Sequence, residues 1–341
     1  MDSKGFYLVK NGSANKAFEL RDIHFPPIAK DELEIKVSAF GLNYADVMAR
    51  NRLYRECPPL PAIIGYEVVG EVVAQGKEVS ENWVGKRVVA FTRFGGYAQK
   101  VRTNFKAAAE IGDYPTGKAL CLATQYVTAY YMARVLLNIR PNERVLVHAA
   151  AGGVGIALID LLKNSGAIVI AKVGGSDKQK FLKERGVEHV VNYKDSDYQQ
   201  TTKNILGANK LDVSFNPFGG STFKKDLSMM GAGGRLVLFG ASEMSGKKWG
   251  FLSMLNFARK MGLLMPISLV MSSKSLLGVN MLKIADEQPD VLQYCLREVV
   301  ALARAGSVQP YVGKEFKHEQ LAEAHELLAS GKSKGKIAVF W

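Results

Sequence analysis

The sequence predicts an α/β fold in which a doubly wound parallel sheet is inserted into a smaller, mainly antiparallel β body. The chain has 341 residues, which is long enough for two domains. Over residues 1–122 short strand patterns alternate with turns, whereas over residues 123–285 helical patterns alternate with buried strands. Residues 286–341 end in another strand pattern. We therefore expect this last segment to return to the β body.

The individual segments support this order of elements. Runs rich in β-branched and aromatic residues, bounded by turn residues, occupy residues 32–43, 66–76 and 86–101. Over residues 144–173 the run RVLVHA leads into a glycine-rich turn, then a helical pattern, then a second apolar run, AIVIAKV. This succession is typical of a crossover between parallel strands. A long amphipathic helix is expected over residues 290–306, ahead of the closing strand pattern IAVFW.

The composition is that of a globular, basic protein. Hydrophobic residues make up 48% of the chain and charged residues 23%, which excludes a disordered chain. Lysine and arginine number 45 against 32 acidic residues, giving a formal net charge of +13. These basic residues are scattered and do not interleave with aromatic residues in a stripe, so no nucleic-acid partner is expected. The densest basic run, residues 330–336, is interpreted as a solvated turn.

Cysteine usage and hydropathy indicate a cytoplasmic protein. Cys57, Cys121 and Cys295 are far apart and odd in number, which argues against a disulfide framework. The first residues lack the apolar centre of a signal peptide, and the most apolar run, residues 261–271, is too short to span a bilayer. We expect no transmembrane segment. Peripheral membrane association is the less favoured alternative, since a net charge of +13 attracts anionic lipids.

The run VHAAAGGVGIAL, residues 147–158, predicts a dinucleotide site. Ala149, Gly152 and Gly155 follow the spacing of the dinucleotide fingerprint, with alanine in the first glycine position. Small residues between a strand and a helix let the backbone approach a pyrophosphate, which the helix N-terminus favours. The expected contacts are Ala151, Gly152, Gly153, Val154 and Gly155. The alternative is close packing of the helix with no ligand.

The end of the next strand pattern favours NADP(H) over NAD(H). An acidic residue that would bind the ribose hydroxyls of NAD is absent from residues 172–176. Asp177 is explained by the helix dipole, because it follows Ser176, which is interpreted as an N-cap. Gly174, the Ser176 hydroxyl and Lys178 are suited to bind a ribose phosphate. NAD(H) remains the alternative cofactor.

Two further segments carry a family resemblance. The run IIGYEVVGEVVAQGKEV, residues 63–79, and the run GLNYADVMARNRLY, residues 41–54, resemble the medium-chain dehydrogenase/reductase superfamily. The matching signature residues are Gly65, Glu67, Gly70 and Gly76. The resemblance implies a GroES-like β-barrel catalytic domain with an inserted Rossmann domain. It also implies an active site in the cleft between them and a homodimer.

The zinc ligands of that superfamily are missing here. Tyr66 stands where zinc enzymes have histidine, and GLNYAD lacks the ligand cysteine. The five histidines show no spacing for one metal, and His318 and His325 are interpreted as surface residues of a helix. We predict no metal. The chain resembles the zinc-independent quinone oxidoreductases of the zeta-crystallin type, and within them the vesicle-amine-transport-protein group.

The resemblance implies hydride transfer from NADPH to a quinone or an α,β-unsaturated carbonyl. Asn43 matches an asparagine beside the nicotinamide, although it could be a turn residue instead. Tyr54 matches a tyrosine that could donate to a developing oxyanion; the alternative is a half-buried aromatic residue with a satisfied hydroxyl. Asp46 is expected to orient its neighbours. Further cofactor contacts are implied at Thr128, Tyr193, Phe239, Gly240 and Asn280.

Two questions stay open at this stage. The apolar stretch of residues 249–273 is interpreted as a subunit or domain interface, and the alternative is a mobile wall for a bulky acceptor. The leading functional hypothesis is an NADPH-dependent reductase. The alternative is an NADPH-binding interaction protein, with a membrane surface, RNA or protein partner and little or no turnover.

Overall fold

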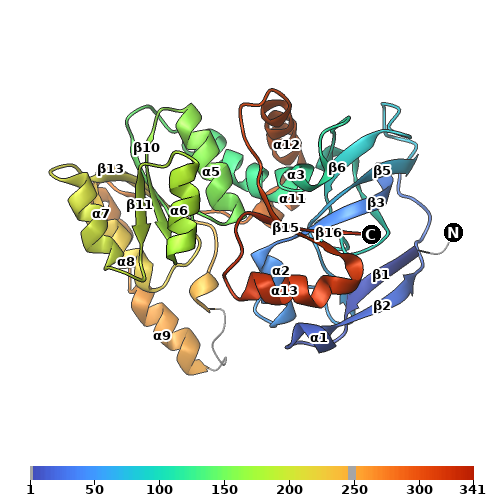
Figure 1. Cartoon of the computed structure of the whole chain (residues 1–341), viewed down its shortest axis with the longest axis horizontal. Coiled ribbons are helices and arrows are strands. Elements are labelled where there is room, and N and C mark those ends of the chain that lie inside the picture. Colours follow the sequence, from blue (N-terminus) through green and yellow to red (C-terminus); the bar gives the residue numbers. More distant parts are fainter. Residues whose placement is uncertain (1–2, 245–250) are drawn as a thin grey trace. The chain divides into compact units, whose positions relative to one another are not determined.

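The computed structural model describes residues 3–244 and 251–341 (Figure 1). The chain forms two units, of which one comprises Met1–Thr128 and Met281–Trp341 and the other Ala129–Asn280. The second unit is continuous in sequence and interrupts the first. The sequence patterns change at residues 122 and 285, and the boundaries between the two units lie at residues 128 and 280.

The second unit is built on a six-stranded parallel sheet with the strand order β11-β10-β9-β12-β13-β14. Its strands are β9 (Arg144–Val147), β10 (Ile168–Val173), β11 (His189–Asn192), β12 (Leu211–Asn216), β13 (Met230–Leu238) and β14 (Ser275–Gly278). In chain order this is the doubly wound arrangement, in which ligands bind where the order reverses. That reversal lies between the neighbouring strands β9 and β12.

Helices lie on both faces of this sheet. The described helices of the unit are η3 (Tyr131–Leu136), α5 (Gly153–Asn164), α6 (Ser176–Glu184), α7 (Tyr198–Leu206), α8 (Ser221–Met229), η4 (Ser242–Met244), α9 (Phe251–Met261) and α10 (Pro266–Ser272). In Figure 1, α5 and α6 lie on one side of the strands, and α7 and α8 lie on the other. Leu146, Ile170 and Leu236 of the sheet pack in one core with Phe223 of α8. In α10, by contrast, no residue is buried.

The first unit contains two sheets that are mainly antiparallel. The larger has the order β15-β16-β3-β5-β6-β8 with β7 paired to β3, and the smaller has the order β2-β1-β4. Their strands are β1 (Ser3–Leu8), β2 (Phe18–Ile23), β3 (Glu32–Leu42), β4 (Ala62–Ile63), β5 (Glu67–Gln75), β6 (Arg87–Phe91), β7 (Lys100–Asn104), β8 (Ala108–Glu110), β15 (Val312–Lys317) and β16 (Lys336–Phe340). Only β15 and β16 pair in parallel among these strands.

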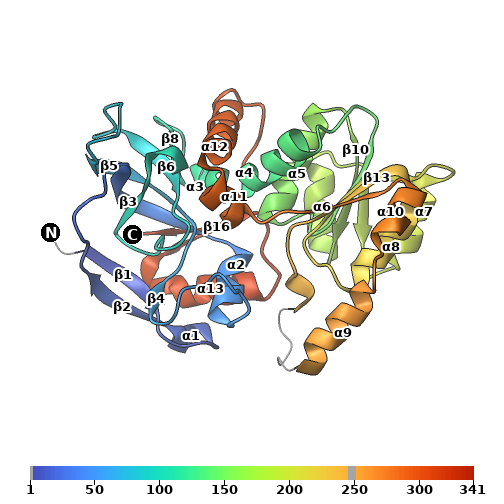
Figure 2. The same ribbon diagram turned by 180° about the vertical axis from the view of Figure 1, so that it is seen from behind.

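After the second unit the chain returns to this β body. β16 pairs antiparallel with β3, with Ala338 opposite Gly41, and both lie in the first unit in Figure 2. The helices of the unit are α1 (Ala14–Ala17), α2 (Tyr44–Arg50), η1 (Phe105–Ala107), α3 (Thr116–Ala119), η2 (Leu122–Tyr126), α4 (Val127–Tyr130), α11 (Met281–Glu287), α12 (Pro289–Arg304), η5 (His318–Gln320) and α13 (Leu321–Ala329), of which α4 ends beyond Thr128. The predicted fold class is therefore confirmed.

Two interpretations of basic residues are wrong. Lys336, assigned to a solvated turn, begins β16 and is fully buried. His325, interpreted as a helix surface residue, is also fully buried, and its Nε2 lies 3.1 Å from the Tyr97 hydroxyl. Burial lowers the pKa of His325 to about 3. In both cases the polar group has a partner from a distant segment, and local sequence could not indicate it.

Candidate functional site

The glycine-rich turn follows β9, beside the point where the strand order reverses. Ala149 adopts a φ of 48°, a left-handed conformation that favours glycine. The turn is closed by a 2.8 Å hydrogen bond from the Gly152 N–H to the Ala149 carbonyl. α5 then begins at Gly153, with Gly152 as an extended N-cap residue. The alanine in the first position of the fingerprint therefore takes the backbone shape that glycine usually supplies there.

Gly155 shows why the turn requires small residues. A Cβ atom on Gly155 would lie 2.6 Å from the carbonyl oxygen of Ala149 and 2.6 Å from the Cα atom of Ala150. Both are backbone atoms, so neither can move aside as a flexible side chain would. The first N–H groups of a helix have no partner within it, and its dipole favours an anion there. The turn has the chemistry to receive a pyrophosphate on the backbone of residues 151–155.

The other cofactor-binding candidates of the second unit follow the carboxyl ends of its strands. Gly174, Ser176 and Lys178 follow β10, Tyr193 follows β11, Phe239 and Gly240 follow β13, and Asn280 follows β14. Because the strands are parallel, their carboxyl ends meet at one edge of the sheet. The structure thus places all of these candidates, together with the glycine turn, along one edge.

Gly174 and Tyr193 are in close contact. A Cβ atom on Gly174 would lie 2.5 Å from the Tyr193 hydroxyl oxygen, so glycine makes room for this ring. The N–H of the next residue, Gly175, donates to Asn192 Oδ1 at 2.9 Å. The loop between β10 and α6 is therefore fixed to the end of β11.

The interpretation of Ser176 as an N-cap is wrong. α6 spans Ser176–Glu184, and its N-cap is Gly175, which has a φ of 138°. Glycine adopts this positive φ without the steric cost that a serine side chain would add. Ser176 and Lys178 instead lie in the first turn of α6.

In the first unit, Asn43 belongs to a buried polar cluster that joins three segments. Its Nδ2 donates to Glu67 Oε1 at 3.0 Å, and its Oδ1 accepts from Lys336 Nζ at 3.1 Å. Lys336 and Glu67 also form an ion pair, and both side chains are fully buried. Burying either charge alone would carry a large desolvation penalty, so each charge is stabilised by the other. The Asn43 amide is held by both partners. Glu67 was recognised in the sequence as a signature residue, but Lys336 was not recognised as part of this cluster.

Asp46 fixes the backbone next to this amide. Its Oδ2 accepts a 2.7 Å hydrogen bond from the Asn43 N–H, and the residue is fully buried. Burial raises the pKa of Asp46 to about 7. The Glu67 carboxylate acts in the same direction, whereas the Asn43 N–H favours the ionised form. These contacts support the orienting role expected for Asp46.

Tyr54 and Thr128 complete the candidates in the first unit. Tyr54 is partly buried, and its ring lies edge-on to that of Tyr66, with centroids 6.2 Å apart. Burial raises the pKa of Tyr54 well above that of a free phenol, so the hydroxyl keeps its proton. Thr128 donates to the Thr124 carbonyl at 2.6 Å. Asn43, Tyr54 and Thr128 lie in the first unit, and the remaining candidates lie in the second.

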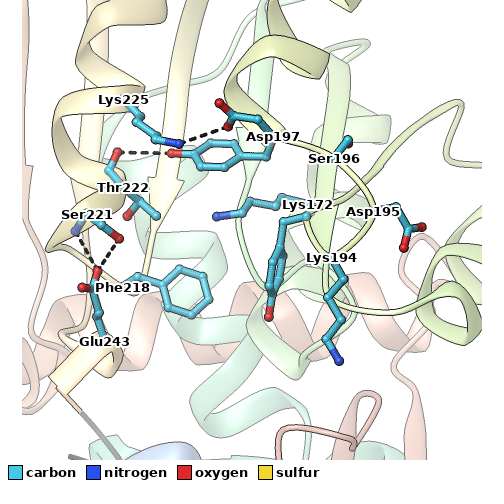
Figure 3. Close-up of a pocket in the computed structure, with 12 residues that line it drawn as sticks. Lys172, Lys194, Asp195, Ser196, Asp197, Phe218, Ser221, Thr222, Lys225 and Glu243 are labelled. Atoms are coloured by element: carbon cyan, nitrogen blue, oxygen red, sulfur yellow. Dashed lines mark hydrogen bonds and ion pairs between the residues drawn. The ribbon is translucent and has the colours of Figure 1, made fainter.

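The second unit also contains a pocket of about 810 Å³ that Tyr193 lines (Figure 3). Its most buried lining residue is Lys172 of β10, which is only 5% exposed. Sequence analysis missed this residue. The sequence feature that could have indicated it is the single lysine within the apolar run of residues 167–173.

Comparison with known proteins identifies the family. The alcohol dehydrogenase GroES-like domain family matches residues 29–136, and the zinc-binding dehydrogenase family matches residues 153–297. A synaptic vesicle membrane protein VAT-1 homolog from Mus musculus is 30% identical over 92% of this chain and 77% of its own length. The chain belongs to the medium-chain dehydrogenase/reductase superfamily.

Other members of the superfamily are similar over most of the chain. A VAT-1 homolog from Danio rerio is 30% identical over 92% of this chain, which spans 64% of that relative. The structure of a human VAT-1 homolog-like protein has a TM-score of 0.85 at 25% identity and covers 100% of this chain and 98% of its own. Escherichia coli quinone oxidoreductase complexed with NADPH has a TM-score of 0.84 at 26% identity, with 99% and 100% covered.

The zinc positions of this superfamily are altered in the structure as well as in the sequence. Tyr66, in the place of a ligand histidine, is 3% exposed and packs against Phe94, with ring centroids 5.3 Å apart. Across residues 3–244 and 251–341, no three His, Cys, Asp or Glu side chains gather closely enough to hold a metal ion. A reaction without zinc stays a prediction. Over the same residues, no helix is long and apolar enough to cross a membrane.

Proposed function

We propose that this chain is a zinc-independent, NADPH-dependent oxidoreductase that reduces quinones or α,β-unsaturated carbonyl compounds. The observation that carries the proposal is the turn at residues 149–155, where backbone crowding at Gly155 excludes any side chain. A helix N-terminus at the switch point of a doubly wound sheet suits a pyrophosphate. Escherichia coli quinone oxidoreductase, 26% identical, is complexed with NADPH, which supports the same cofactor here.

We assign the remaining cofactor contacts by their place along the sheet edge. Tyr193 would flank the adenosine, and Gly174, Ser176 and Lys178 would bind the ribose phosphate that distinguishes NADPH from NADH. Phe239, Gly240 and Asn280 are proposed for the other contacts at this edge, and Thr128 of the first unit is proposed to face the nicotinamide. Each of these residues would bind and orient the cofactor, since NADPH itself supplies the hydride when it is bound.

Two residues of the first unit are proposed to act on the reacting groups. Tyr54 would donate a hydrogen bond to the acceptor oxygen as negative charge develops on it, because its phenol remains protonated. Asn43 would orient the nicotinamide with an amide that Glu67 and Lys336 hold in place.

A second candidate function rests on other observations. Several relatives are named synaptic vesicle membrane proteins, and the net charge of +13 would suit an anionic partner. The chain would then bind NADPH but turn over little or no substrate. We favour the reductase, and propose a cytoplasmic homodimer that acts on a small molecule.

Oxidation of NADPH in the presence of a panel of quinones and enones tests the proposal. We expect turnover with at least one acceptor, and we expect Lys178→Glu to reduce kcat/KM for NADPH by about tenfold or more while NADH is affected less. The physical reason is repulsion between the new carboxylate and the ribose phosphate.

Lys180→Glu is the matched control, because it makes the same charge change on an exposed side chain of the same helix. Equal losses with NADPH and NADH in Lys178→Glu would remove Lys178 from the phosphate site. Absence of turnover with every acceptor, together with salt-sensitive retention on anionic vesicles, would favour the interaction protein.

A further inference from the structure

The pocket beside Tyr193 contains a buried amine that the proposed reductase reaction does not use. Its walls come from the carboxyl ends of β10, β11 and β12 and from the first turns of α7 and α8. Lys172 enters it from β10, and in Figure 3 its side chain points toward Phe218 and Thr222. Lys172 thus lines the pocket from an interior strand of the sheet.

Aromatic rings surround this amine. Lys172 Nζ lies 3.7 Å from the ring centroid of Tyr198, 5.2 Å from that of Tyr193 and 5.4 Å from that of Phe218. The rings give the pocket flat, apolar walls next to the Lys172 amine, and Lys194 and Lys225 also line the pocket. A planar or aromatic body would fit between them with its reactive group at Lys172.

A hydrogen-bond chain behind Lys172 fixes the orientation of the amine. Lys172 Nζ lies 3.3 Å from His148 Nδ1, and His148 Nε2 lies 2.8 Å from Asp226 Oδ2. Ser214, Asn216 and Tyr198 also donate to Asp226. Burial opposes ionisation of Asp226, but His148, Ser214 and Asn216 together hold its pKa below the usual value, so it is an ionised acceptor and His148 carries its proton on Nε2. Nδ1 is then free to accept an N–H from Lys172.

The surroundings also favour a neutral amine. Burial lowers the pKa of Lys172 to about 8. The charged groups that face it are Asp226 and Lys225 of α8, Glu243 of η4 and Asp197 ahead of α7, and Lys225 adds to the lowering while the carboxylates oppose it. Burial likewise lowers the pKa of His148, which keeps the imidazole neutral. A larger fraction of Lys172 than of an exposed lysine therefore has a free lone pair near neutral pH.

We propose that Lys172 is a carbonyl-reactive amine and that its pocket is a covalent binding site for aromatic aldehydes. The lone pair of Lys172 Nζ attacks the aldehyde carbon, and a proton from the nitrogen ends on the former carbonyl oxygen. The resulting carbinolamine loses water, giving an imine between Nζ and the aldehyde carbon. One aldehyde and one amine become one imine and one water, with no change in oxidation state. His148 Nδ1 is the nearest acceptor for a proton in transit.

Site-resolved labelling of the protein without NADPH tests this proposal. The probe is pyridoxal 5′-phosphate, an aromatic aldehyde, followed by borohydride to trap the imine and by peptide mass spectrometry. At pH 7.5 we expect Lys172 to be labelled about tenfold or more faster than Lys180, whose side chain is 79% exposed. The labelling rate at Lys172 should rise with pH and level off above a midpoint near 8. This experiment does not rest on the proposed function, because neither NADPH nor turnover is involved.

Lys172→Arg is the matched variant, since it keeps a cation in the pocket but cannot form an imine. It should lose the fast adduct while retaining its circular dichroism spectrum and the slow labelling of exposed lysines. Should Lys172 in the unmodified chain react no faster than Lys180, or show no inflection below pH 9.5, the proposal is wrong. The wild-type comparison remains decisive even if the variant fails to fold.

Discussion

At the residue scale, burial decides what Tyr54 and Tyr66 can do. Burial raises the pKa of both phenols, and the Asp46 carboxylate adds to the effect. A phenol that keeps its proton can donate a hydrogen bond at any working pH, but it cannot serve as a base. Tyr66 is 3% exposed, whereas Tyr54 is partly buried. Of the two, Tyr54 is therefore the better candidate to meet a substrate.

Replacement of Tyr54 by phenylalanine removes that donor and keeps the ring. We expect Tyr54→Phe to lower kcat by about tenfold to a hundredfold, with little change in the dissociation constant of NADPH, because the bond strengthens as charge develops. Steady-state kinetics and fluorescence titration with NADPH would measure the two quantities. Equal effects on both, or none on either, would exclude the proposed role.

At the scale of an element, the turn before α5 shows how backbone geometry can substitute for a missing signature residue. Ala149 adopts the left-handed conformation although it carries a side chain. Gly155 cannot carry a side chain, because backbone atoms of residues 149 and 150 occupy the space that a Cβ atom would need. The turn therefore depends more on its last glycine than on its first position.

Gly155→Ala should open this turn. We expect the free energy of unfolding to fall by about 1–3 kcal/mol and the affinity for NADPH to fall by tenfold or more, since the backbone must shift. Thermal melts and titration with NADPH measure these effects. Gly278→Ala is the control, because a Cβ on Gly278 would meet nothing within 4 Å. If Gly155→Ala binds and melts like Gly278→Ala, the turn is not as tight as the structure indicates.

At the scale of the whole molecule, apolar side chains are exposed beside the last strand of the parallel sheet. Leu263 is 95% exposed, Val270 73% and Met271 83%. They lie next to or within α10, and β14 is the last strand of its sheet among the described residues. Of the apolar stretch of residues 249–273, residues 249 and 250 lie outside the described residues. An exposed apolar patch of this kind favours the proposed homodimer.

A charge within this patch tests the homodimer. We expect Met271→Lys to raise the dimer dissociation constant by at least about tenfold, because a lysine would lose its hydration at the interface. Sedimentation velocity over a range of protein concentrations measures it. Val84→Lys makes the same change at a site 49% exposed in the first unit and should have no effect. A monomeric wild type, or a Met271→Lys dimer as stable as wild type, contradicts the proposal.

The fold could be predicted from the sequence alone because it is indicated by patterns within short segments. Glycine spacing, apolar runs and a crossover unit are visible within about thirty residues, as residues 144–173 illustrate. Lys336 and His325 were misinterpreted because their partners, Glu67 and Tyr97, lie more than two hundred residues away in the sequence. Lys172 was missed for a similar reason, since its pocket is formed by side chains that follow three different strands. Pairings of this kind appear only in three dimensions.

The pairing of β16 with β3 has a consequence for the order of events during synthesis. Domains usually fold as the ribosome releases them, the earlier ones first. Here the unit that begins earlier in the chain completes its folding later. Its buried Glu67 can pair with Lys336 only after Lys336 has left the exit tunnel. The interrupting unit needs no later residues for its own sheet. A nascent chain stalled near residue 320, with the inserted unit already outside the tunnel, should therefore resist protease over that unit while the flanking unit is still cut.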